Sequence, residues 1–158
     1  MANEGLNAWP ESRRLKLPLT WRAQLKELGI LASKQELAGL ASAITLTVKD
    51  SKGQWILAQH SQAYCEQSLS YSRDSGESFG MSVIDRTFID AGIRWIIDYK
   101  FTRPTEQETN AQFEQRQMNY YKGQLNHYAS LYRQMGPEPV RCALYFPQIA
   151  MFSPITVE

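Results

Sequence analysis

The residues of this chain whose types and spacing could do chemistry lie between positions 85 and 100. Ile96-Ile97-Asp98-Tyr99-Lys100 has the pattern of an apolar strand that ends in Asp-x-Lys. Because successive side chains of a strand point to opposite faces, Asp98 and Lys100 share one face. Asp85 lies on the preceding candidate strand. Two carboxylates beside a lysine are groups suited to metal-assisted phosphodiester hydrolysis.

The pairing of Asp85 with Asp98 depends on the turn between their strands. A two-residue turn at Ala91-Gly92 places Asp85 directly opposite Asp98, with Cβ atoms roughly 5 Å apart, whereas a three-residue turn shifts this register by one. Carboxylates that close repel each other unless a cation lies between them. Mg²⁺ typically takes one or two carboxylates. We therefore expect a Mg²⁺ or Mn²⁺ site in which Lys100 orients the attacking water and stabilises charge on phosphorus.

The triplet alone is weak evidence, because at average amino-acid usage it occurs by chance about once in a chain of this size. Asp50-Ser51-Lys52 is a second copy, beside Gly53 in an expected surface turn, and we interpret it as solvated charge. Two plainer readings stay open for the first copy. Asp85 could form a cross-strand ion pair with Arg86, and Asp98 could pair with Lys100 on a solvated edge.

The elements that must position these residues follow from hydrophobic periodicity. Residues 1–16 are polar and aperiodic and are expected to form a tail or linker, and residues 17–158 one domain. Helices are expected over 18–29 and from Ser33, where Glu36 three positions on completes a capping box. A third helix is expected over 110–135 and admits a break near 121–123. Extended segments are expected over the ranges 55–57, 66–72, 81–89, 93–101, 140–146 and 150–152.

This order predicts an α/β fold with a central mixed sheet flanked by helices. The two cysteines, Cys65 and Cys142, are too few and too far apart for a disulfide framework or a zinc site. No apolar run is long enough for a membrane span and no secretory signal is apparent. We expect a reduced, cytoplasmic protein that does not associate with membranes.

Several ordered motifs resemble the RecB-like nuclease module of the PD-(D/E)XK superfamily. That module occurs at the carboxyl end of UvrD-type helicase-nucleases and in exodeoxyribonuclease V. The resemblance covers roughly residues 20–150. It is carried by Val83-Ile84-Asp85-Arg86-Thr87-Phe88, by Arg94-Trp95-Ile96-Ile97-Asp98-Tyr99-Lys100, by the Gln-x-x-x-Tyr motif Gln124-Leu125-Asn126-His127-Tyr128, by the closing strand 140–147, and by the upstream segments 55–57 and 60–69.

The resemblance implies a restriction-endonuclease-like fold that hydrolyses DNA with Mg²⁺ or Mn²⁺ in repair or recombination. Asp85, Asp98 and the backbone carbonyl of Tyr99 would ligate the metal, with Glu66 as a further acidic ligand or a water-orienting group, and Lys100 would be the catalytic lysine. Gln124 and Tyr128, one helical turn apart, would lie beside the site and contact the DNA strand or support the lysine. The DNA would be linear ends or single strands supplied by a helicase domain or subunit.

The sequence also departs from that family. Helicase-linked members carry a histidine on an upstream helix, and neither His60 nor His127 is in that position. No phosphate-binding loop of an ATP-driven motor is present. The net charge of +1 lacks the basic excess of a protein that grips nucleic acid alone, and Arg103, Arg116 and Lys122 form at most a small basic rim. A catalytically idle DNA-binding or docking module, and a nuclease acting on RNA, therefore remain alternatives.

Overall fold

The computed structural model describes residues 23, 26–27, 31–73 and 78–158. The predicted tail (residues 1–16) and most of the predicted helix at 18–29 lie outside these residues. The chain divides into two compact units. One comprises Met1–Trp55 and Pro147–Ala150, and the other comprises Ile56–Phe146 and Met151–Glu158. All the residues predicted to form the site belong to the second unit.

Helix α3 (Lys34–Lys49) confirms the predicted capping box. The Ser33 hydroxyl accepts the N–H of Glu36 at 3.2 Å, and the Glu36 carboxylate accepts the N–H of Ser33 at 2.8 Å. Such a cap satisfies backbone donors that have no partner within the helix. Leu37 in its first turn and Val48 in its last are both buried.

The turn predicted at 50–53 and the extended segment predicted at 55–57 are both wrong. The chain forms a second helix there, α4 (Ser51–Leu57). Asp50 explains the difference, because it serves both helices. Its N–H donates to the Leu46 carbonyl at 2.9 Å and closes α3, while its carboxylate accepts the N–H of Gly53 at 2.8 Å and caps α4.

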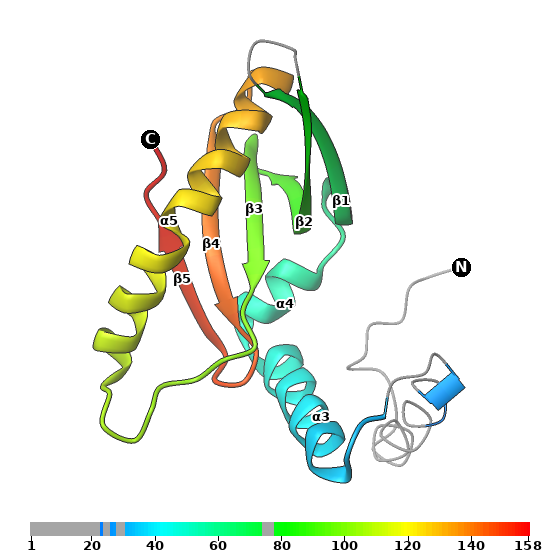
Figure 1. The fold of residues 1–158 in the computed structure, drawn as a ribbon, viewed down its shortest axis with the longest axis vertical. Helices are drawn as coiled ribbons and strands as arrows, with labels where there is room; N and C mark the ends of the chain where they lie inside the picture. The colour runs from blue at the N-terminus through cyan, green and yellow to red at the C-terminus, as the bar shows by residue number, and fades with distance from the viewer. Residues whose placement is uncertain (1–22, 24–25, 28–30, 74–77) are drawn as a thin grey trace. The chain divides into compact units, whose positions relative to one another are not determined.

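The second unit is built on a five-stranded mixed sheet with the order β1-β2-β3-β4-β5 (Figure 1). Only β3 and β4 pair in parallel, and the other neighbours are antiparallel. Five of the six extended segments predicted from sequence contribute to it, and 55–57 does not. Strands β1, β2 and β5 are longer than expected, and β3 is shorter. The strands are β1 (Ser61–Arg73), β2 (Ser78–Asp90), β3 (Ile93–Tyr99), β4 (Val140–Phe146) and β5 (Met151–Ile155).

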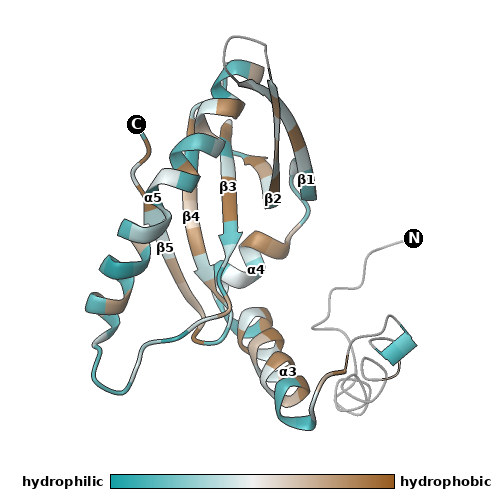
Figure 2. Cartoon of the chain, viewed as in Figure 1, coloured by the Kyte–Doolittle hydropathy of each residue, from teal (hydrophilic) through white to brown (hydrophobic). Residues whose placement is uncertain are grey.

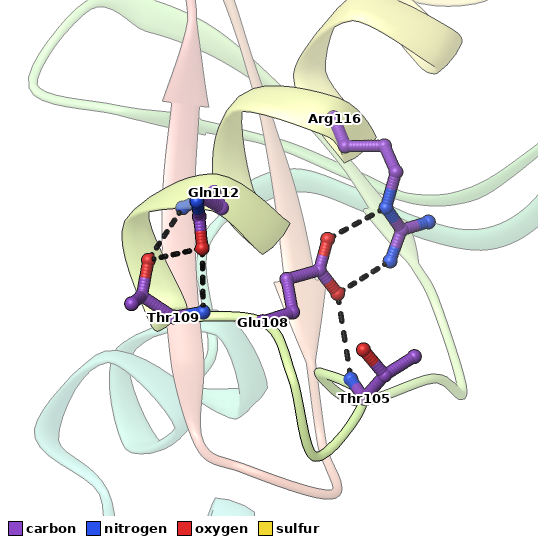
Figure 3. Close-up of polar contacts among 5 residues, drawn as sticks. All are labelled: Thr105, Glu108, Thr109, Gln112 and Arg116. Carbon is purple, nitrogen blue, oxygen red and sulfur yellow. Dashed lines mark hydrogen bonds and ion pairs between the residues drawn. The ribbon is translucent and has the colours of Figure 1, made fainter.

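Helix α5 (Asn110–Met135) supplies the long connection that the parallel pair β3–β4 requires and packs along the sheet (Figure 1). Its bounds match the prediction, and it continues through residues 121–123 without the break that the sequence admitted. Thr109 and Gln112 form its capping box, with bonds of 2.9 and 3.3 Å. Figure 3 shows this start of the helix together with the two-bonded ion pair between Glu108 and Arg116, at 2.7 and 2.8 Å.

The second unit has buried side chains on both faces of its sheet, and α5 covers one of these faces. Apolar residues follow β3 and β4 (Figure 2), and the ring of Phe113 meets that of Phe146 edge to face at 4.9 Å. Ile96 and Leu125 are fully buried on the α5 side of the sheet, and Ile97, the next residue of β3, is fully buried on the opposite side. In the described part of the chain, no helix has the length and apolar character needed to cross a membrane.

Candidate active site

The hairpin of β2 and β3 has the register that the site requires. Ala91 and Gly92 form its two-residue turn, both with positive φ (48° and 77°), and Asp90 pairs with Ile93. This is the geometry of a type I′ turn, whose twist suits the strands it joins. The last ladder pair is Arg86 with Ile97, and the next position in this register joins Asp85 and Asp98. The predicted two-residue turn is confirmed.

Asp85 lies where the β2–β3 ladder ends. Its carboxylate, rather than a carbonyl of β2, accepts the backbone N–H of Tyr99 at 2.8 Å. This bond fixes one carboxylate oxygen of Asp85 against the end of β3, beside Asp98. The alternative ion pair with Arg86 is not the arrangement adopted, since Arg86 donates to the carbonyls of Ile56 and Ala58 at 3.2 and 3.1 Å.

Asp98 and Lys100 form a close ion pair, with 2.5 Å between Oδ2 and Nζ. The side chains are 4% and 18% exposed, so the plainer reading of a pair on a solvated edge does not describe it. Burial raises the pKa of Asp98, the hydrogen bond and charge of Lys100 lower it, and the nearby charge of Asp85 raises it again. The net direction is upward. Burial of Asp98, with a smaller contribution from the charge of Asp85, therefore outweighs the compensation that Lys100 provides.

Helix α5 brings Gln124 and Tyr128 to the same place, as their spacing predicted. The Gln124 amide donates to Asp98 Oδ1 at 3.4 Å and to the Tyr128 hydroxyl at 2.7 Å. Tyr128 in turn donates to the carbonyl of Val83 on β2 at 3.2 Å. This chain of hydrogen bonds links the helix to both strands of the hairpin. The two oxygens of the Asp98 carboxylate therefore have different partners, since Gln124 donates to Oδ1 and Lys100 contacts Oδ2.

Tyr121 is a residue of the site that sequence reasoning missed. The ammonium of Lys100 lies 4.1 Å from the centre of the Tyr121 ring. A cation over an aromatic face at this distance is stabilised by about 0.5–2 kcal/mol, depending on its hydration. A signal was available, because Tyr121 precedes Gln124 by three residues and so lies on the same helix face.

Glu66 lies on β1 opposite Asp85 in the strand register, but its side chain is not grouped with those of the two aspartates. Its neighbours Cys65 and Gln67 pair with Arg86 and Ile84, which flank Asp85. Glu66 itself is exposed and has a φ of 51°, in the left-handed region that non-glycine residues seldom adopt. Within residues 31–73 and 78–158, no three acidic, histidine or cysteine side chains are grouped to hold a metal. The role predicted for Glu66 stays a prediction.

The remaining predicted positions have plainer surroundings. Tyr99 places its ring against Tyr145, edge to face at 6.2 Å, and burial raises the pKa of its phenol. Cys142 is buried, which raises the pKa of its thiol to about 12. Of the expected basic rim, Arg116 pairs with Glu108, and Lys122 pairs with Glu158 at 2.8 Å. The charge that these two residues offer to a phosphate is therefore largely compensated.

The site has the ligand chemistry of a hard divalent cation. Its two aspartates repel each other, one of them is buried, and Lys100 supplies a single compensating charge. Mg²⁺ needs no more than one or two carboxylates from protein and fills its other positions with water or phosphate oxygens. Asp85 and Asp98 thus suit such an ion without a third acidic ligand.

Comparisons with known proteins leave the family open: no protein-family model matches the sequence, and no curated protein matches it.

Proposed function

We propose that this chain is a metal-dependent deoxyribonuclease of the restriction-endonuclease-like class. The observation that carries the proposal is the meeting of Asp85, Asp98, Lys100 and Gln124 at the point where the β2–β3 ladder ends. Two interacting carboxylates beside a lysine, held by a helix, are poorly explained as a device for stability. A buried ion pair contributes little net stability compared with apolar packing.

In the proposed reaction each residue acts on a stated atom. Asp85 and Asp98 would hold a Mg²⁺ or Mn²⁺ ion, which would supply Lewis-acid activation of a phosphoryl oxygen and of water. Lys100 donates hydrogen bonds from Nζ to the phosphate oxygen that gains charge as water attacks phosphorus. One ester P–O bond breaks, the departing oxygen takes up a proton from solvent, and the proton of the attacking water passes to solvent. Gln124 and Tyr128 keep the Asp98 carboxylate in its orientation.

A second candidate is a catalytically idle module that binds DNA or docks a partner. The 2.5 Å contact between Lys100 Nζ and Asp98 Oδ2 favours it, because the lysine occupies an oxygen that a metal would need. The near-neutral charge of +1 also suits a module without a DNA-gripping surface of its own. The two candidates differ in whether cleavage depends on the charges of Asp98 and Lys100.

Cleavage of linear DNA by the purified chain, with Mg²⁺ or Mn²⁺ and with EDTA, tests the proposal. We expect metal-dependent cleavage, reduced at least about 100-fold by Asp98→Asn or Lys100→Met. Lys52→Met is the matched control, because it removes the lysine of the second Asp-x-Lys triplet and should leave the rate unchanged. Glu66→Gln should reduce the rate less than Asp98→Asn does. Folded parent protein that cleaves nothing would favour the idle module.

A further inference from the structure

Two neighbouring tyrosines of α5 lie at the proposed site. Tyr121 contacts Lys100, and Tyr120 is exposed to solvent. Tyr120 is 78% exposed, the second largest exposure among the large hydrophobic residues of α5 and the sheet. Its ring meets that of Tyr121 at 4.8 Å between centres, with the ring planes at 80°. This edge-to-face contact holds two neighbouring rings in a defined arrangement. Most of the Tyr120 ring is left open to a ligand.

The pair is joined to the lysine of the proposed site. Nζ of Lys100 lies 4.1 Å from the Tyr121 ring centre, and that centre lies 4.8 Å from the Tyr120 centre. The Tyr120 ring therefore lies no more than 8.9 Å from the ammonium.

Exposed aromatic rings beside a cation have a recognised ligand chemistry. Nucleobases stack on aromatic side chains while neighbouring cations meet the phosphates, and this holds for every base because each has a π face. Within a duplex these faces are already covered by neighbouring base pairs. An accessible aromatic face next to the reacting phosphate can therefore be used by an unpaired nucleotide but not by a base pair inside a duplex.

We propose that Tyr120 and Tyr121 form a base-stacking subsite that takes an unpaired nucleobase next to the phosphate held by Lys100. Tyr120 provides the stacking face, and Tyr121 connects it to the lysine. The inference rests on the proposed nuclease function, since it assumes that a phosphate lies at Lys100. It gives the chain a preference for single strands and frayed ends over intact duplex.

Binding and cleavage are measured separately, so that each idea can fail alone. The binding probe is a phosphorothioate-linked single strand, which resists hydrolysis, carrying one 2-aminopurine whose fluorescence falls on stacking. Its annealed duplex is the comparison. We expect Tyr120→Ala to weaken single-strand binding roughly ten-fold or more and to abolish the fluorescence change. Tyr120→Phe should keep both, and duplex binding should change little. Met135→Ala, which truncates another exposed side chain of α5 (64% exposed), is the matched control.

The outcomes separate clearly. Parent protein that cleaves DNA while Tyr120→Ala binds and stacks the single strand as the parent does would overturn the subsite and leave the nuclease standing. Equal loss of single-strand and duplex binding would overturn it as well. Stacking that depends on Tyr120, in a protein that cleaves nothing, would support the subsite and refute the proposed catalysis.

Discussion

Asp98 holds its charge in an unfavourable position. Its side chain is 4% exposed, Asp85 lies near enough to raise its pKa, and Lys100 offsets only part of these effects. Groups with a perturbed pKa and a specific charged neighbour concentrate at functional sites, although structural ion pairs also produce them. The contact with the Tyr121 ring positions Lys100, and the hydrogen bond from the Tyr99 N–H positions Asp85.

The raised pKa of Asp98 has a consequence for stability. A group whose pKa is higher in the folded protein than its ordinary value of 3.8 stabilises the fold below that value. The stabilisation is lost as pH rises through the higher, folded pKa. Asparagine does not titrate. With EDTA present, the free energy of unfolding of Asp98→Asn should therefore gain on that of the parent as pH rises from about 4 to about 8.

Urea unfolding across this pH range measures the difference, with Glu106→Gln, an exposed loop carboxyl, as the control. An Asp98→Asn variant whose free energy of unfolding falls relative to that of the parent as pH rises would mean that the pKa of Asp98 is lowered, not raised.

At the scale of single residues, the sequence predicted the positions of those site residues whose spacing along a strand or helix places them on one face. Asp98 and Lys100 on one strand face, and Gln124 and Tyr128 one helical turn apart, converge as expected. The bond between Asp85 and the Tyr99 N–H could not be predicted, because it depends on where the β2–β3 ladder ends. The left-handed backbone of Glu66 is likewise a tertiary feature with no local signal.

The elements that carry the site are one hairpin and one helix. Apolar alternation and the Ala91-Gly92 turn were enough to predict β2, β3 and their register, and the helical character of residues 110–135 was enough to predict α5, whereas its capping box at Thr109 was not foreseen. Helix α4 was missed because Asp50 and Gly53 have the composition of a turn. In the fold the Asp50 side chain caps a new helix instead, and only the surrounding packing decides between the two.

The turn of the β2–β3 hairpin can be made more stable by a single substitution. Ala91 has a φ of 48°, which costs an alanine roughly 1–2 kcal/mol. Asparagine tolerates this conformation and is the preferred first residue of a type I′ turn. Ala91→Asn should raise the free energy of unfolding by about 0.5–1 kcal/mol without changing activity. Chemical denaturation tests this, and Gly92→Ala should have the opposite effect. A loss of stability in Ala91→Asn would mean that the turn is of another type.

The whole molecule carries little of the charge that DNA binding normally uses. The net charge is +1, and Arg116 and Lys122 are paired with Glu108 and Glu158. Affinity for DNA depends chiefly on the number of phosphates neutralised. The predicted helicase partner would make up for this lack by supplying DNA to the site, and that partnership remains a prediction.

Salt dependence tests this at the same scale. For binding of the chain to duplex DNA, the logarithm of the association constant should fall against the logarithm of salt concentration with a slope shallower than about −3. Fluorescence anisotropy at several salt concentrations gives this slope. A value near −6 would mean that the chain contacts many phosphates and needs no partner to hold its substrate.

The central claim is that Asp85 and Asp98 hold a divalent cation beside Lys100, and titration calorimetry with Mn²⁺ tests it most directly. The parent should bind one ion in this site, and Asp85→Asn and Asp98→Asn should each lose it. Lys100→Met should bind at least as tightly, because it frees the Asp98 oxygen that the lysine contacts. Binding that survives the loss of both aspartates, or a folded parent that binds no ion, would contradict the claim.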